Sequence, residues 1–302
     1  MVDMIPVNIY LLFKNLNHNI KMSDIDILNS NEERGSILYK ANNIVLKPEQ
    51  NNFTKNYYPS IKKLCSIDLK YISNYKNKKN INPNIFYYDY IKGNKLCDFV
   101  YHYGIKSIDK KAIIENLVKF IKFYINIDTG IFDKKIKTLE VDNDIIDFRK
   151  KLNGNNSFNK NLIQIYDTCI IKQKQTNKPL LLLKDLNAHN IIISDKNDVK
   201  LIDMSDGIII GNYNSFIHRY FSLLWLFGEK VVDKAIKDCG INNDNLLIKE
   251  ISFFYFFNYQ LHVFELDSPI ERFERQLFKY KCSRISKKII KSLTRRYPDL
   301  LS

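Results

Sequence analysis

The sequence is poor in the two residues that interrupt regular structure. Nine glycines and seven prolines in 302 residues fall well below average usage. This scarcity excludes collagen-like and linker-rich architectures and predicts a chain built mostly of helices and strands. The sequence also lacks both the G-x-G-x-x-G and the Walker A patterns, which excludes a Rossmann dinucleotide site and a P-loop.

Cysteines and long apolar runs are scarce as well. The five cysteines are odd in number, scattered and never spaced as C-x-x-C. That pattern argues against a disulfide framework and a zinc site, so we expect a reducing, cytoplasmic environment. No apolar run approaches the roughly 20 residues of a membrane span. The short run at residues 7–13 has no basic flank and no cleavage site, so no secretion signal is expected.

What the chain does contain is enough apolar surface for a large core. Hydrophobic residues make up 45% of it and aromatic residues 13%, which excludes disorder over most of its length. At 302 residues the chain is long enough for one large core or two smaller ones. We therefore expect a globular protein with room for two lobes.

Positive charge dominates and is concentrated at one end. The formal net charge is +14, and residues 271–302 contain ten Lys and Arg against three Asp and Glu, so half of the surplus lies in the last tenth of the chain. Between residues 271 and 297 apolar residues recur mostly every three or four positions, which predicts a basic amphipathic helix. A terminal helix docked on the core is the favoured interpretation. Contact with a membrane surface, a glycolipid or another polyanion is the alternative, and no specific nucleic acid is predicted.

The first third of the sequence predicts a small antiparallel sheet. Short β-like runs cover residues 24–28, 35–41 and 44–47, and the Asn42-Asn43 pair indicates a tight turn between the last two. Pro59 suits the start of a helix that continues to Ile72. A polar loop over 74–84 and a strand over 85–91 follow, and a turn at Lys92-Gly93-Asn94 marks the boundary between an N-terminal lobe, residues 1–92, and a C-terminal lobe, residues 93–302.

Helical periodicity dominates the C-terminal lobe, with one interruption. Residues 108–127, 162–173, 216–232 and 246–264 predict helices. Between the second and the third of these, apolar runs at 180–183, 191–193 and 199–202 predict a strand, a loop and a hairpin. The predicted fold class is therefore α+β.

The loop and hairpin carry the residues with the clearest chemistry. An apolar strand leads to Asp185, Asn190 stands five residues on, and a second strand leads to Asp203. Two carboxylates and an amide directed into one cleft suit phosphoryl transfer. One carboxylate orients or deprotonates a hydroxyl, while the amide and the other carboxylate hold Mg²⁺.

At these residues the chain resembles the protein-kinase-like superfamily, in its aminoglycoside phosphotransferase and choline kinase branch. The block Asp185-Leu186-Asn187-Ala188-His189-Asn190 is also similar to the D-L-x-x-x-N loop of lipopolysaccharide-sugar kinases. The resemblance covers residues 25 to about 225. It implies a bilobal fold in which a small antiparallel-sheet lobe precedes a larger, mainly helical lobe. It also implies Asp185 as the catalytic base and Asn190 and Asp203 as metal ligands.

The same resemblance implies a nucleotide site between the lobes. Lys47 ends the third predicted strand, where kinase-like enzymes place the lysine that contacts the nucleotide phosphates. Asp68 is the only acid on the following helix that could pair with Lys47. The backbone of Asp89, Tyr90 and Ile91 resembles the hinge that holds adenine. The cofactors implied are ATP or GTP and Mg²⁺.

Four features depart from the pattern of the family. Leu183 stands two before Asp185, where a histidine is common, and Ser222 stands where an aspartate often supports the catalytic loop. No Gly-rich loop joins the first two strands, and the helix after Lys47 has no glutamate.

His189 could touch substrate or pack the loop, and Asp206 could support a second metal or form a turn before Gly207.

Three functions follow from these residues. The favoured hypothesis is an ATP- and Mg²⁺-dependent small-molecule kinase that phosphorylates a hydroxyl of an aminoglycoside-like, amino-alcohol or sugar acceptor. The departures leave open a pseudokinase that binds nucleotide without transferring phosphate. The basic tail leaves open a protein that binds polyanions or membrane surfaces.

Overall fold

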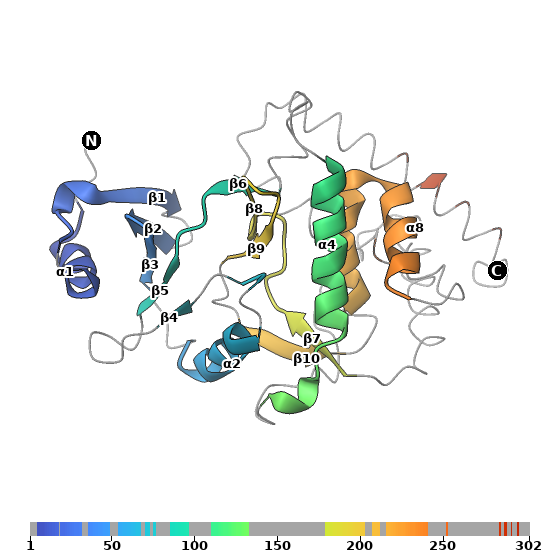
Figure 1. The fold of residues 1–302 in the computed structure, drawn as a ribbon, viewed down its shortest axis with the longest axis horizontal. Helices are drawn as coiled ribbons and strands as arrows, with labels where there is room; N and C mark the ends of the chain where they lie inside the picture. The colour runs from blue at the N-terminus through green and yellow to red at the C-terminus, as the bar shows by residue number, and fades with distance from the viewer. Residues whose placement is uncertain are drawn as a thin grey trace, which may run out of the picture.

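The computed structural model divides into a small sheet-bearing part and a larger helical part (Figure 1). It describes residues 5–17, 19–31, 36–48, 54–67, 70–72, 75–76, 85–96, 110–132, 179–202, 207–211 and 216–240, and the single residues 252, 284, 287, 288, 291 and 295. Within them no helix is long and apolar enough to cross a bilayer. The predicted helix at 162–173 falls outside the described residues, and so does the one at 246–264 apart from Ser252, which is helical.

The small part is a five-stranded antiparallel sheet in the order β1-β2-β3-β5-β4. The strands are β1 (Ile25–Asn31), β2 (Ser36–Ala41), β3 (Ile44–Pro48), β4 (Tyr75–Lys76) and β5 (Ile85–Asp89). Asn42 has a φ of 51°, so the β2–β3 hairpin turns at the predicted Asn pair. The three strands predicted before residue 48 are confirmed, whereas β4 lies in a stretch that we expected to be a loop.

Alternating side chains give the two faces of this sheet different neighbours. Leu46 packs into a cluster with α1 (Val7–Leu16), whereas Val45 belongs to the main core together with Ile61 and Leu64 of α2 (Thr54–Ile67). Because successive residues of a strand point to opposite faces, Lys47 lies on the face of Val45, away from α1.

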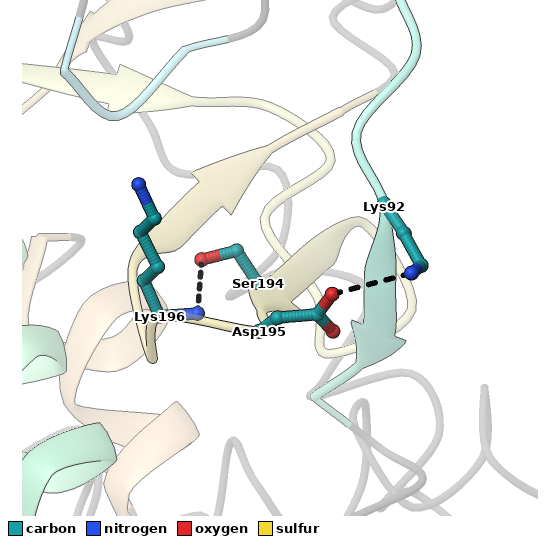
Figure 2. A network of polar contacts seen from close by, with 4 residues as sticks. All are labelled: Lys92, Ser194, Asp195 and Lys196. Atoms are coloured by element: carbon teal, nitrogen blue, oxygen red, sulfur yellow. Dashed lines mark hydrogen bonds and ion pairs between the residues drawn. The ribbon is translucent and has the colours of Figure 1, made fainter.

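The chain crosses from one sheet to the next within a few residues. β6 (Gly93–Lys95) forms a three-stranded antiparallel sheet with β8 (Ile191–Ser194) and β9 (Val199–Leu201), in the order β6-β8-β9. Lys92, just before β6, forms an exposed ion pair with Asp195 in the β8–β9 turn, 3.6 Å between Nζ and Oδ2 (Figure 2). Gly93 and Asn94, predicted as part of a turn with Lys92, therefore belong to a strand. The division into lobes at residues 92 and 93 remains a prediction.

The main core is built around α4 (Lys110–Ile125). Its buried face, which includes Phe120 and Tyr124, packs against β7 (Leu180–Leu183), β9 and α8 (Glu229–Asp238). β7 is buried at all four positions and pairs antiparallel with β10 (Ile208–Gly211). This apolar layer supports the loop that follows β7.

The helix predicted over residues 216–232 is not continuous. It consists of a π-helical turn η4 (Ile217–Phe221), a 3-10 turn η5 (Leu223–Phe227) and then α8. Gly228 separates η5 from α8 with a φ of 100°, a conformation that suits glycine. The predicted helix after Lys47 also differs, since α2 begins at Thr54 rather than at Pro59 and ends at Ile67.

Candidate active site

Asp185 lies in the first turn after β7, and both oxygens of its carboxylate accept hydrogen bonds from asparagine side chains. Asn187 Nδ2 donates to Oδ1 and Asn190 Nδ2 donates to Oδ2, each at 2.7 Å. Asn190 Nδ2 also donates to the backbone carbonyl of Asp185 at 3.0 Å. The loop thus fixes the carboxylate as well as the main chain of Asp185.

Asn187 organises this loop, and the sequence analysis did not single it out. It is 5% exposed, and its Oδ1 accepts from the backbone N–H groups of His189 at 2.9 Å and Asn190 at 3.1 Å. Asparagine favours such local turns because its side chain can replace a backbone acceptor. The signal available in the sequence was its position two residues after Asp185.

Asn190 keeps its side-chain oxygen available for a ligand. Its Nδ2 is used on Asp185, while no described residue donates to its Oδ1. An amide oxygen is a ligand type that Mg²⁺ accepts. Within the described ranges no group of three or more His, Cys, Asp or Glu side chains could hold a metal. The chemistry of Asn190 therefore fits a metal site that other oxygen donors would have to complete.

Asp203 and Asp206 lie outside the described residues, but the chain on either side of them is fixed next to the loop. The Ile202 N–H donates to the Asn190 carbonyl at 2.8 Å, and the Lys184 N–H donates to the Gly207 carbonyl at 3.2 Å. The segment that contains Asp203 thus begins beside Asn190 and ends beside the residue that precedes Asp185.

Arg219, three residues before Ser222, donates hydrogen bonds to the strand end that precedes the loop. Ser222 stands where the family often has a supporting aspartate. Arg219 is 3% exposed, and its Nη1 donates to the carbonyl oxygens of Leu183 at 3.1 Å and Lys184 at 2.6 Å. Ser222 Oγ donates to the carbonyl of Arg219, one turn back in its own helix, at 2.7 Å. The available signal was a charged residue inside the apolar run 216–232.

On the sheet side, the structure describes most of the predicted nucleotide residues. Lys47 is half-buried near the end of β3, opposite Phe86 of β5. Asp89 ends β5, and the Tyr90 N–H donates to the Asn43 carbonyl at 2.7 Å. Asp68 lies outside the described residues.

Comparisons with known proteins complete the picture of the fold. No protein-family model and no curated protein match the chain. Several solved structures match the chain in fold. A streptomycin–ATP ternary complex of APH(2")-IIa matches with a TM-score of 0.57 at 18% identity, over 85% of this chain and 89% of that one.

Two further solved structures agree with the first. A GDP complex of an aminoglycoside 2'-phosphotransferase-IIIa variant matches with a TM-score of 0.62 at 12% identity, over 98% of this chain and 99% of that one. Choline kinase LicA from Streptococcus pneumoniae matches with a TM-score of 0.54 at 13% identity, over 94% and 98%. The chain has a protein-kinase-like fold. The predicted bilobal α+β architecture is thereby confirmed.

In this kinase-like fold the two lobes also touch away from the chain crossing at β6. The Leu201 N–H of β9 donates to the Tyr71 carbonyl at 2.6 Å, and Ile72 forms a parallel bridge with Leu201. Lys200 Nζ donates to the Lys70 carbonyl. The segment after α2 is thus attached to the strand that leads toward Asp203.

Proposed function

We propose that the protein is a nucleotide- and Mg²⁺-dependent phosphotransferase that acts on a hydroxyl of a small molecule. The observation that carries the proposal is the Asp185 carboxylate, held at both oxygens by Asn187 and Asn190. A fixed carboxylate next to an available amide oxygen is the arrangement that phosphoryl transfer uses to place a hydroxyl and a metal.

Each residue has one role in this proposal. Asp185 orients the acceptor hydroxyl and takes its proton. Asn190 through Oδ1 and Asp203 through its carboxylate hold Mg²⁺, and the Ile202–Asn190 hydrogen bond supports a shared site for them. Bound Mg²⁺ would neutralise charge on the phosphates.

The nucleotide would lie between the lobes. Lys47 would contact its phosphates, with Asp68 as the acid that pairs with this lysine. Since the Tyr90 N–H already donates to Asn43, the base would use the backbone groups of Asp89 and Ile91. Solved neighbours of the same fold contain ATP, ADP or GDP, which supports a nucleotide without choosing between ATP and GTP.

The acceptor is proposed as a class. Neighbours with this fold were solved with streptomycin, kanamycin and spectinomycin, and others are a choline kinase and a macrolide 2'-phosphotransferase. All are named for hydroxyl-bearing small molecules, which supports an aminoglycoside-like, amino-alcohol or sugar acceptor for this chain.

A phosphate-transfer screen tests the proposal. ATP and GTP are each supplied with Mg²⁺ against aminoglycosides, amino alcohols and core sugars, and products are detected by the mass of one added phosphate. We expect at least one acceptor to be phosphorylated, and chelation of Mg²⁺ by EDTA to abolish the product because the phosphate charge is then left uncompensated.

The same screen distinguishes the pseudokinase alternative. That alternative predicts that ATP or GTP raises the thermal midpoint, because a ligand that binds the native state stabilises it, while no acceptor gains mass. The absence of both stabilisation and transfer would reject the nucleotide-dependent function altogether.

The basic tail supports a second candidate function, contact with an anionic membrane surface. Its described residues, Arg284, Lys287, Lys288, Lys291 and Arg295, are all helical and exposed. Lys288 contacts Glu229 at the start of α8, at 3.2 Å. In the amphipathic helix predicted over residues 271–297, the spacing 284, 288, 291 and 295 would place cations on one face, where like charges repel. An anionic surface would relieve that repulsion.

Charge removal tests this second function. Each basic residue near an anionic surface contributes about 1 kcal/mol, so the triple change Arg284→Ala, Lys291→Ala and Arg295→Ala should weaken binding to phosphatidylserine-containing vesicles about 100-fold. The matched control removes Lys110, Lys111 and Lys119, which are exposed on α4. Co-sedimentation measures the binding, and an equal loss in both triple variants would count against a tail-specific surface.

A further inference from the structure

Arg219 is a charged side chain within the core. It lies on the π-helical turn η4, is 3% exposed, and donates through Nη1 to the carbonyl oxygens of Leu183 and Lys184. Burial of a guanidinium is costly unless strong hydrogen bonds compensate for the lost water. A π-helical turn is itself rare and often occurs at functional sites. The buried charge of Arg219 and the π-helical turn that contains it therefore both indicate a specific structural or functional role.

The two carbonyls that Arg219 contacts lie immediately before Asp185. Donation from one nitrogen to these two carbonyl oxygens fixes two successive peptide units, Leu183–Lys184 and Lys184–Asp185. The second unit contains the backbone nitrogen of Asp185, whose carboxylate accepts hydrogen bonds from Asn187 and Asn190. Arg219 therefore positions the backbone that leads into Asp185, and the two asparagines position the carboxylate of Asp185.

The neighbour of Arg219 in the chain holds the turn in place. Tyr220 is fully buried, its ring stacks on Phe216 with a centroid distance of 4.1 Å, and it packs against Phe120 and Tyr124 of α4. Its hydroxyl donates to the Leu181 carbonyl at 3.3 Å. The consecutive side chains of Arg219 and Tyr220 thus both donate hydrogen bonds to carbonyl groups of β7. The packing of Tyr220 in the core therefore holds η4, and with it Arg219, in place.

We propose that Arg219 is the positioning residue for Asp185, in place of the histidine that is absent at Leu183 and the aspartate that is absent at Ser222. This inference rests on the proposed function, since it concerns the same site. Without the guanidinium, the Leu183 and Lys184 carbonyls lose the hydrogen bonds from Arg219, and the loop can rotate away from the geometry that the transfer needs.

The experiment compares Arg219→Met, Arg219→Lys and Ser222→Ala with the wild type. Misplacement of a catalytic group by about 1 Å can cost 10²-fold, so Arg219→Met should lower kcat by about 10- to 100-fold while the KM for nucleotide stays within about twofold. Arg219→Lys keeps a cation that can reach one carbonyl and should recover part of the loss. Ser222→Ala should stay close to wild type, because its hydroxyl bonds within its own helix.

Hydrogen exchange gives a readout that does not depend on activity. Amides of residues 184–190 should exchange faster in Arg219→Met, while those of α4 keep wild-type protection. A wild-type kcat in Arg219→Met, or a larger loss in Ser222→Ala, overturns the inference. If the wild-type protein phosphorylates no acceptor, the proposed function fails, and unchanged exchange at residues 184–190 then rejects the role of Arg219 separately. If Arg219→Met does not fold, the same comparisons are made with Arg219→Lys.

Discussion

Replacement of Asp185 by alanine is expected to lower the rate of phosphate transfer by about 10² to 10⁴, the usual contribution of general-base assistance. Asn187 and Asn190 hold both carboxylate oxygens, so the wild-type group is already oriented when the acceptor binds. The rate is measured as kcat with saturating nucleotide on any acceptor found in the screen. Because Asp185 is proposed to act on the hydroxyl, stabilisation by nucleotide should remain.

The structure offers a matched control for this substitution. Asp195 lies ten residues further on, exposed in the β8–β9 turn with Lys92 as its partner (Figure 2). Exposed ion pairs contribute little to stability, so Asp195→Ala should leave kcat and the thermal midpoint nearly unchanged. Equal rates for Asp185→Ala and the wild type would end the assignment of Asp185.

Substitution of Gly93 should have the largest effect on stability. A Cβ at this position would lie 2.2 Å from the carbonyl oxygen of Ile193 and 2.8 Å from Ile192 Cγ2. The first of these atoms is backbone of the paired strand β8, so β6 and β8 must separate to accept any side chain. Forced overpacking costs roughly 1–3 kcal/mol. We therefore expect Gly93→Ala to lower the thermal midpoint by several degrees.

Gly130→Ala is the control for this effect. Its Cβ would meet Asp128 Oδ1 at 3.2 Å; this atom is the end of an exposed side chain that accepts a hydrogen bond from the Gly130 N–H and need shift only slightly. Thermal unfolding followed by circular dichroism measures both variants, and Gly93→Ala should be clearly the less stable. Identical midpoints would show that the β6–β8 pairing tolerates the side chain. Because β8 begins directly after Asn190, we also expect Gly93→Ala to reduce phosphate transfer.

The sequence predicted the elements whose patterns are local. The β2–β3 hairpin and α4 are recognisable from alternation, an Asn-Asn turn and helical spacing, and they form close to the predicted bounds. The turn expected around Gly93 is a strand, because pairing with β8, about a hundred residues away, outweighs its local preference. α1 was not predicted, since its apolar face is recognisable only once the sheet that it covers is known.

The candidate site divides in the same way. Asp185 and Asn190 could be found because the motif that contains them is short and contiguous. Arg219 could not be assigned its role, since that role depends on a contact with residues 35 and 36 positions earlier in the chain. Ser222 was identified as a departure from the family's aspartate, and its hydroxyl donates to the Arg219 carbonyl. Asp203 and Asp68 remain predictions.

The attachment of residues 70–72 to β9 limits how the two halves of the molecule can move. Backbone hydrogen bonding joins Tyr71 to Leu201, and a β-bridge joins Ile72 to the same residue. Any relative movement of the two parts must therefore either preserve the pairing between residues 70–72 and β9 or break its backbone hydrogen bonds.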